Sequence, residues 1–319
     1  MKMLQMFLPT VMSWEEHISF GAGLWFEEMW HHFLSLQNNS LVEPYLMHLL
    51  ARVSRDCPGL FVWSNKLDFM FSKLLRSLQL GPDTGFNQTF PLENATVWLV
   101  YMIGVEKDAQ SCLTRLMTLT ETFFHPSNDG DHSSHLLKLL LRLVYGMVAR
   151  IKRERSGKTQ SAIPDEFKMT ETRIDKFVLS LLPCVKLAIF TQVKEEYIYG
   201  IIKYLALLAP KIVLPGILEI LDPAFETVTE PHRLTQSLSC FFASTIPMLR
   251  EEVANGERSR KAELLVLLKK FLPAIDPNDP KKTRLCFLVL GIMVNNVPLV
   301  DCSAAVRLRN DLTKDEQEV

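Results

Sequence analysis

The chain has 319 residues, of which 48% are hydrophobic, and its formal net charge at pH 7 is −1. It can therefore bury a sizeable core, and it is longer than most single compact domains. Intrinsic disorder is excluded, because apolar residues are plentiful and the net charge is small. A near-neutral chain also lacks an overall attraction to nucleic acid or to an anionic membrane. We expect a folded protein with neither as a direct partner.

The cysteines and the first residues indicate the compartment. Six cysteines are scattered without a C-x-x-C pair, which favours a reduced intracellular protein. Residues 3–12 are apolar, but Pro9 interrupts them and no small-residue cleavage site follows, so a secretory signal is not expected. We interpret the sequons at Asn38, Asn87 and Asn94 as chance matches. No uncharged apolar run reaches the length of about 18 residues that spans a bilayer.

Apolar residues recur at helical spacing along most of the chain. The segments expected to be helical are 25–34, 46–53, 67–78, 113–124, 136–147, 177–182, 198–208, 264–272 and 285–293. Loops are expected at 81–85, 126–131, 156–164, 255–256 and 276–280. Neither strand alternation nor an Asn-Gly hairpin signal is convincing, so the pattern predicts an all-α protein.

Residues 207–241 contain three prolines that we expect to begin helices. Pro210, Pro223 and Pro231 each stand where a first-turn proline loses no hydrogen bond. Asp222 and Thr229 precede the last two and supply capping oxygens. Short apolar runs lie between the prolines. Helices this short are not stable alone in water, so the pattern predicts that they stack.

Many helices joined by short turns favour antiparallel helical hairpins. Apolar-apolar-proline elements recur at 7–9, 181–183 and 271–273 with irregular spacing, as in degenerate HEAT arrays with units of about 40 residues. A compact helical bundle is the alternative, but so many helices fit a one-dimensional stack more easily. We predict that residues 1–319 form a single α-solenoid of HEAT/armadillo-like helical hairpins, with a hinge or loop at 156–164.

Neither end of the sequence resembles a polar capping repeat. Residues 1–12 are mostly apolar, and the C-terminal part is strongly polar only from 311 to 319. Because solenoid ends need a polar outer face, we expect the chain to be part of a longer repeat array.

A basic run, Arg150 to Arg155 with Lys158, is the strongest electrostatic feature. It could bind a polyanion or a nuclear import receptor. Alternatively, its cations complement the dipole at a helix C-terminus, which we favour because short basic runs are common. Gly157-Lys158-Thr159 resembles the end of a phosphate-binding loop, but Lys152 stands where that loop needs its first glycine. Nucleotide binding is rejected.

Five metal-capable side chains gather in one short stretch: His125, Asp129, Asp131, His132 and His135. Such ligands would suit zinc. The alternative is a polar loop in which Asp131 or Ser133 caps a helix beginning near Ser134. Nothing in the spacing fixes a tetrahedral set, so we favour the cap.

The tryptophans are interpreted as packing anchors between repeats, with an aromatic recognition face as the alternative. They are Trp14, Trp25, Trp30, Trp63 and Trp98. No nucleophile elbow, H-E-x-x-H or Gly-rich dinucleotide loop occurs. We therefore predict no catalytic residue, no cofactor and no metal site, which means that the protein is not an enzyme.

Three short segments, which follow one another along the chain, resemble a known family. They are Phe61-Val62-Trp63 through Phe69 to Leu74-Leu75-Arg76-Ser77-Leu78; then Leu208-Ala209-Pro210, Val213-Leu214-Pro215 and Thr229-Glu230-Pro231-His232-Arg233-Leu234; and last Leu299-Val300-Asp301-Cys302. Together they resemble the large HEAT-repeat proteasome activators, the proteasome activator complex subunit 4 family. The resemblance implies a curved helical shell that sits on the core proteasome, opens its gate and promotes ATP-independent degradation of peptides and acetylated histones.

The resemblance also implies nuclear and cytoplasmic location and links to DNA repair and spermatogenesis. Family members dock on the proteasome through their last three residues, which are a hydrophobic residue, a tyrosine and a third residue of any type. This sequence instead ends Gln317-Glu318-Val319. Their acetyl-lysine pocket lies in a C-terminal part that this chain does not cover, so no site residue is carried over. The alternative function is a generic helical-repeat scaffold that holds one protein partner.

Overall fold

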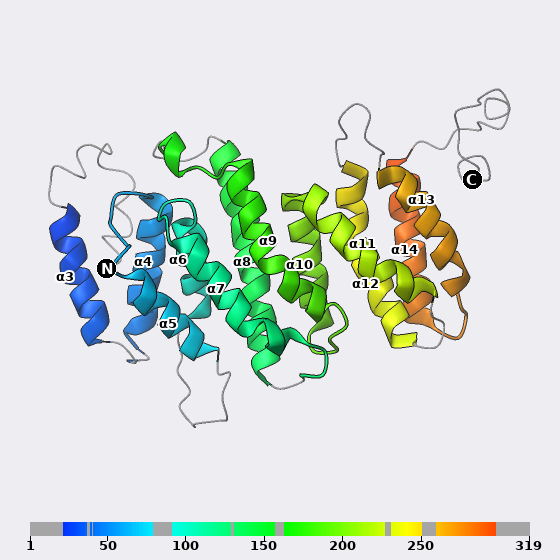
Figure 1. Cartoon of the computed structure of the whole chain (residues 1–319), viewed down its shortest axis with the longest axis horizontal. Helices are drawn as coiled ribbons and strands as arrows, with labels where there is room; N and C mark the ends of the chain where they lie inside the picture. Colours follow the sequence, from blue (N-terminus) through cyan, green and yellow to red (C-terminus); the bar gives the residue numbers. More distant parts are fainter. Residues whose placement is uncertain are drawn as a thin grey trace. The chain divides into compact units, whose positions relative to one another are not determined.

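The computed structural model describes residues 22–36, 39, 41–78, 91–128, 131–156, 163–226, 231–250 and 260–297. These residues form twelve α-helices and three short 3₁₀ helices, η1 to η3, and no β-strand occurs among them (Figure 1). The α-helices are α3 (Ala22–Ser35), α4 (Glu43–Asp56), α5 (Leu67–Ser77), α6 (Leu92–Met102), α7 (Ala109–Thr120), α8 (Asp131–Ser156), α9 (Glu171–Ala188), α10 (Glu195–Leu208), α11 (Pro210–Glu226), α12 (Pro231–Arg250), α13 (Arg260–Phe271) and α14 (Pro280–Asn296). The all-α prediction is confirmed.

The chain divides into two compact units, residues 1–187 and 188–319. The hinge expected at 156–164 falls inside the first unit, and its residues 157–162 lie outside the described part of the chain. The single solenoid and the hinge therefore stay predictions. Each unit is described separately.

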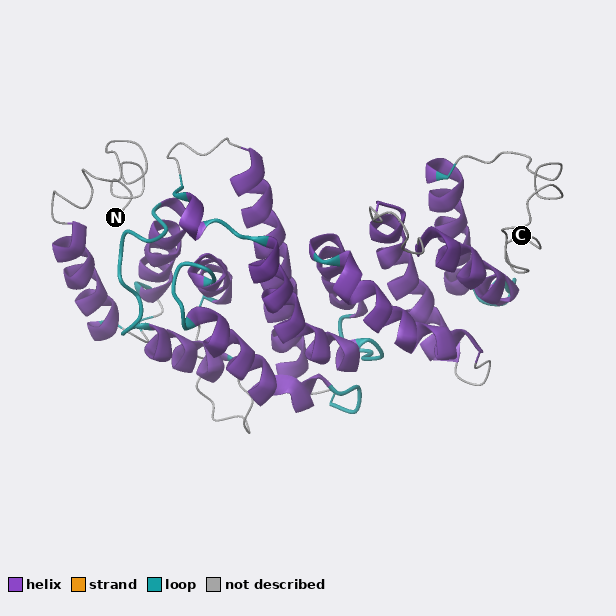
Figure 2. Cartoon of the chain, turned by 45° about the horizontal axis from the view of Figure 1, so that its top comes forward, coloured by secondary structure: helices purple, strands orange, loops and turns teal. Residues whose placement is uncertain are grey.

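Alternate helices pack on one another within the first unit. α4 contacts α6, and α6 contacts α8, so these three helices form one layer. α5 contacts α7 in a second layer, and α5 also contacts α6. Figure 2 shows these helices lying side by side. Successive helices thus pair as hairpins, and the hairpins stack, as in HEAT repeats.

The second unit repeats this arrangement. α10, α12 and α14 form one layer, because α12 contacts both of the others. α11 and α13 contact each other and also contact α12 (Figure 1). The prediction of stacked HEAT/armadillo-like helical hairpins is confirmed within each unit.

Amphipathic stripes account for the longer helices. In α8 the predicted stripe of Leu136, Leu139, Leu140, Leu143 and Met147 is completely buried. Its side chains recur every three to four residues and so face one side of the helix. Burial of this stripe against α6 fixes the orientation of α8 in the layer.

One predicted helix start is wrong. Helices do begin at Pro210 and Pro231, but Pro223 lies inside α11, which continues to Glu226. A proline inside a helix removes one backbone hydrogen bond. Leu221 and Phe225 flank it on a buried face, and their burial holds the helix together across the break. Asp222 consequently forms no cap, and its carboxylate pairs with Lys270 of α13 at 2.7 Å.

In the described ranges, every helix is too short or too polar to cross a membrane. The proposed cap at Thr229 lies outside those ranges.

Candidate functional site

Three of the predicted tryptophan anchors, Trp30, Trp63 and Trp98, lie in the core of the first unit, and Trp25 is partly buried at its edge. Trp63 and Trp98 are 1% and 2% exposed, and their ring centroids are 5.7 Å apart. Trp30 meets Trp63 edge-on at 6.4 Å, and Trp25 packs against Phe61. These rings join α3, the segment before α5, and α6, so they serve as packing anchors. Trp14 lies outside the described residues.

A buried lysine lies within this aromatic cluster. Lys66 is 2% exposed, and its Nζ is 2.7 Å from Glu27 Oε1. The same nitrogen lies 5.5 Å and 5.6 Å from the ring centroids of Phe26 and Trp30. The carboxylate and the ring faces compensate for the buried charge. No feature of the sequence distinguishes this lysine, because it lies in a polar turn of ordinary composition.

Arg150, the first residue of the basic run, is a buried connector rather than a surface charge. Its side chain is 1% exposed. Nη1 donates to the carbonyl oxygens of Val100 and Ile103 at 2.6 Å, and Nη2 donates to that of Phe167 at 2.7 Å. Nε donates to Glu154 at 2.6 Å. One guanidinium therefore joins the end of α6, helix α8 and the η2 segment (Asp165–Phe167).

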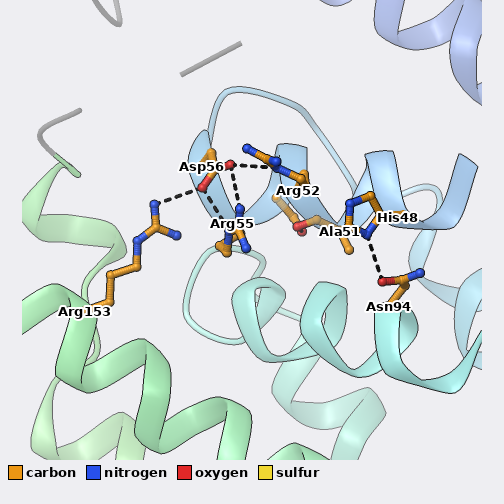
Figure 3. Close-up of polar contacts among 8 residues, drawn as sticks. His48, Ala51, Arg52, Arg55, Asp56, Asn94 and Arg153 are labelled. Atoms are coloured by element: carbon orange, nitrogen blue, oxygen red, sulfur yellow. Dashed lines mark hydrogen bonds and ion pairs between the residues drawn. The ribbon is translucent and has the colours of Figure 1, made fainter. Parts of the chain in front are cut away.

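Arg153 belongs to an ion cluster at the end of α4. Its Nη2 is 2.9 Å from Asp56 Oδ1, and Arg55 and Arg52 contact the same carboxylate at 3.0 Å and 3.4 Å (Figure 3). Burial of Asp56 raises its pKa, but the hydrogen bonds and charges of Arg55 and Arg153 lower it by more, so the pKa lies below the ordinary value. The carboxylate stays ionised and joins α4 to α8, two helices of the same layer that both contact α6.

Three arginines of the basic run, Arg150, Arg153 and Arg155, are thus paired with carboxylates of the same chain. Arg155 pairs with Glu171 of α9 at 2.6 Å, at the surface. Lys152 is exposed, while Lys158 and Gly157–Thr159 lie outside the described residues. The sequence was interpreted either as a polyanion site or as cations that complement the helix dipole. Neither interpretation included these ion pairs, because the partner residues lie elsewhere in the sequence. A polyanion site would have to compete with them, which disfavours that interpretation.

The histidine-rich segment divides between a loop and a helix: His125 precedes α8, whereas His132 and His135 lie in its first turns, because α8 begins three residues before the predicted start near Ser134. α8 begins at Asp131, and the hydroxyl of Ser133 donates to the carbonyl of Asn128 at 2.8 Å. His132 meets Phe123 edge-on, and His125 hydrogen-bonds Ser127 at 2.7 Å. No three His, Cys, Asp or Glu side chains of the described chain come close enough to hold a metal ion. Asp129 lies outside that part.

Two buried thiols are chemically inert. Burial raises the pKa of Cys57 and of Cys184 to about 12 in each case. The thiolate is the reactive form, so at neutral pH almost none of either residue can act as a nucleophile. Cys184 instead donates to the carbonyl of Met117, 3.5 Å away.

A polar cavity of about 440 Å³ lies in the second unit. Its lining residues are Gln192, Glu195, Thr235, Gln236, Asp279 and Lys281. Glu195 pairs with Lys281 at 2.9 Å, and the Tyr199 hydroxyl donates to it at 2.8 Å. Asp279 caps α14 by accepting from the Lys282 amide. Its charged groups are thus paired or capping, and the cavity offers polar side chains that can hydrogen-bond a ligand.

Comparisons with known proteins identify the chain's relatives. A family model for the mid HEAT-repeat region of proteasome activator complex subunit 4 matches residues 113–316. Proteasome activator complex subunit 4B of Danio rerio and subunit 4 of Homo sapiens are each 35% identical over 327 residues, which cover 99% of this chain. Proteasome activator subunit 4 of Arabidopsis thaliana is 24% identical over 332 residues, which cover 94% of it.

The chain spans 18% of the length of each of these relatives. The matched residues include the stacked hairpins of both units, and the buried helix faces described above are what such repeats require. The chain belongs to the proteasome activator complex subunit 4 family.

Proposed function

We propose that this chain is a segment of a HEAT-repeat proteasome activator that binds the core proteasome and promotes ATP-independent degradation of peptides and acetylated histones. The observation that carries the proposal is the 35% identity to a proteasome activator over 99% of the chain. The stacked hairpins support it, because a repeat array offers a long surface for a large partner. Binding, with no bond chemistry by this segment, is the proposed mode of action.

Within such an activator, this segment acts as part of the shell wall. Two buried residues support this role: Arg150 connects α8 to its neighbour α6, and Asp56 connects α8 to α4 in the same layer. Connections of this kind fix the register of successive hairpins. By the family resemblance, the docking tail and the acetyl-lysine pocket belong to other parts of a full-length member. We also propose that the activator acts in the nucleus and the cytoplasm, and that it has roles in DNA repair and spermatogenesis.

The direct test is co-purification with core proteasomes. The tagged chain is prepared alone and together with the remaining parts of a family member, and each sample is mixed with purified core particles without ATP. We expect core particles to be retained when the remaining parts are supplied. Failure to retain them under that condition, with every part folded by circular dichroism, would contradict the proposal.

A generic protein-binding scaffold is the second candidate. Leu41, Val62 and Tyr45 of the first unit are 78%, 69% and 65% exposed, and large exposed apolar groups suit a protein interface. This function predicts a partner other than the proteasome. The two candidates separate in the same experiment, because a scaffold unrelated to the proteasome leaves the core particles in the unbound fraction.

A further inference from the structure

A short segment crosses the end of α8 in the first unit. Residues 164–169, which we call the strap, form the η2 turn and then an extended residue, Lys168, with φ −70° and ψ 153°. Glu166 is exposed, while Phe167 and Met169 are half-buried. Arg173, at the start of α9, donates to the carbonyls of Glu166 and Lys168 at 2.8 Å, which stiffens the turn but does not attach it to α8. A segment with few fully buried apolar groups opens locally at low free energy.

Two oppositely charged side chains of α8 bind the backbone of the strap. Arg150 Nη2 donates to the carbonyl oxygen of Phe167 at 2.7 Å, and Glu154 Oε2 accepts from the Met169 amide at 2.8 Å. The two side chains are 1% and 6% exposed, and they pair with each other at 2.6 Å. Charge-assisted hydrogen bonds are strong, and these two contact only a carbonyl and an amide two residues apart. They can therefore hold any segment with the same backbone shape.

Two glycines make room for the side chains of the strap. Gly59, in the loop after α4, has a φ of +81°, and a Cβ atom added there would overlap the Phe167 ring. Gly104, in the loop after α6, has a φ of +86°, and a Cβ atom added there would lie 3.5 Å from the Met169 sulfur. Glycine permits both the positive φ and the close approach. We call the surface made by the two glycines, Arg150 and Glu154 the strap site. It has places for an aromatic residue and, two positions later, for a long apolar residue.

The contacts that orient Arg150 do not depend on the strap. Its Nη1 donates to the carbonyls of Val100 and Ile103 at 2.6 Å, and its Nε donates to Glu154. These contacts hold the guanidinium in place, and Glu154 is held through it. When the strap leaves, Nη2 of Arg150 and Oε2 of Glu154 become available to a second segment. A site whose groups are already oriented binds such a segment at low entropic cost.

We propose that the strap closes a binding site for an extended segment of a partner protein, and that the partner's segment displaces it. That segment carries an aromatic residue in the place of Phe167 and a long apolar residue in the place of Met169. The strap is the template for this occupant, because it is the segment that the site holds in the structure. Backbone hydrogen bonds combined with side-chain anchors at alternate positions are a common way to bind extended peptides. The inference does not depend on proteasome activation.

Competition between the strap and a peptide tests the proposal. The peptide copies residues 163–170, with capped ends and a fluorophore, and fluorescence anisotropy follows its binding to the full chain. In the unchanged chain the tethered strap competes at an effective concentration on the order of millimolar, so binding is weak. In Phe167→Ala the strap loses its anchor, and we expect the peptide to bind at least tenfold more tightly. Lys168→Ala is the matched control, because that side chain pairs with Asp165 within the strap, and it should bind the peptide as the unchanged chain does.

The peptide has a matched control of its own. A peptide carrying Phe167→Ala is expected to bind the Phe167→Ala chain at least tenfold more weakly than the original peptide. Any one of four results would overturn the proposal. They are no binding to a Phe167→Ala chain that circular dichroism shows to be folded, equal affinity of this chain and the unchanged chain, equal affinity of the two peptides, and tighter binding by Lys168→Ala to the same extent as by Phe167→Ala.

Hydrogen exchange gives a second measurement, which needs no substitution in the chain. The Met169 amide reports the strap, because Glu154 is its acceptor, and the Leu143 amide reports the buried stripe of α8. We expect millimolar unlabelled peptide to accelerate exchange at Met169 at least threefold and to leave Leu143 unchanged. The peptide carrying Phe167→Ala should accelerate neither. Exchange at Met169 that the original peptide leaves unchanged would mean that the strap stays closed, and would contradict displacement.

Discussion

A few buried charged side chains determine how the helices of the first unit meet. Arg150 satisfies three backbone carbonyls that helix geometry leaves without partners. The buried carboxylate of Asp56 pairs with three partly exposed arginines. Removing one member of such a network leaves its partners buried and unsatisfied, which costs more than the net value of the contacts. The first two predictions test these residues.

Replacing Arg150 by methionine should destabilise the chain strongly. The change keeps an unbranched side chain but leaves the carbonyls of Val100, Ile103 and Phe167 without their donor. We expect the free energy of unfolding to fall by about 3–5 kcal/mol. Urea denaturation followed by circular dichroism measures it. Lys152→Met is the matched control on the exposed side of the same helix, and a change within about 0.5 kcal/mol is expected there. Equal effects of the two substitutions would show that Arg150 is not a connector.

The stabilising effect of Asp56 should depend on pH in acid. Its folded-state pKa lies below the ordinary value of 3.8. The carboxylate therefore stabilises the fold fully above the unfolded-state pKa, and this contribution is lost as pH falls through the lower folded-state pKa. The difference in unfolding free energy between the unchanged chain and Asp56→Asn should be constant above about pH 5 and shrink below about pH 4. Denaturation midpoints across this range check it. A difference that stays constant down to pH 2.5 would contradict the ionised assignment.

At the scale of elements, the segment after residue 162 is held by backbone contacts. Glu154 accepts from the Met169 amide at 2.8 Å, and Arg173 donates to the carbonyls of Glu166 and Lys168 at 2.8 Å. These contacts hold the η2 segment in place. They also position the Phe167 ring against Gly59, in the loop after α4.

Gly59→Ala tests this arrangement. The added Cβ would overlap the Phe167 ring, and Gly59 has a φ of +81° that strains any other residue. We expect a loss of roughly 2–4 kcal/mol in unfolding free energy, as for backbone strain combined with a steric clash. Gly104→Ala is the matched control, because Gly104 has a φ of +86° but its nearest neighbour is a flexible arginine at 3.3 Å.

A second variant separates the clash with the Phe167 ring from the backbone strain at the positive φ of Gly59. In a Phe167→Ala background, Gly59→Ala should cost about as much as Gly104→Ala, because only the positive φ remains. A cost that does not change when Phe167 is removed would contradict the ring contact.

Periodicity predicted most helices, because a buried stripe leaves a repeating pattern. The stripe in α8 is one example, and its five residues are buried as expected. Helix α6 was not predicted as a stripe, since residues 98–103 are buried on every side and show no alternation. Pro223 was misinterpreted because tertiary burial overrides the local cost of a proline in a helix.

The chemistry of the buried charges was less predictable. A run of arginines has the same appearance in a sequence whether it faces solvent or reaches into the core. Arg150 finds its partners 47 and 50 residues earlier, and Asp56 lies 97 residues before Arg153. Such partners are fixed by the packing of layers, which one sequence does not display. The family resemblance, in contrast, rests on local phrases and could be identified directly.

At the scale of the whole molecule, the chain consists of stacked helical hairpins and belongs to the proteasome activator complex subunit 4 family. Both units stack helical hairpins in two layers, and the family match includes residues of both. The chain spans 18% of its relatives' length, so its function depends on what the rest of such a protein does. The proposed role of this segment is structural: it forms part of the wall of the activator's helical shell.

The most direct measurement is peptide hydrolysis by core proteasomes with a chimeric activator. In the chimera, this chain replaces the corresponding segment of a family member, and fluorogenic peptide hydrolysis is followed without ATP. The account predicts stimulation close to that of the unchanged family member, which is lost with Arg150→Met in the segment and kept with Lys152→Met. A chimera that is helical and monodisperse but leaves hydrolysis at the rate of core proteasomes alone would contradict the claim.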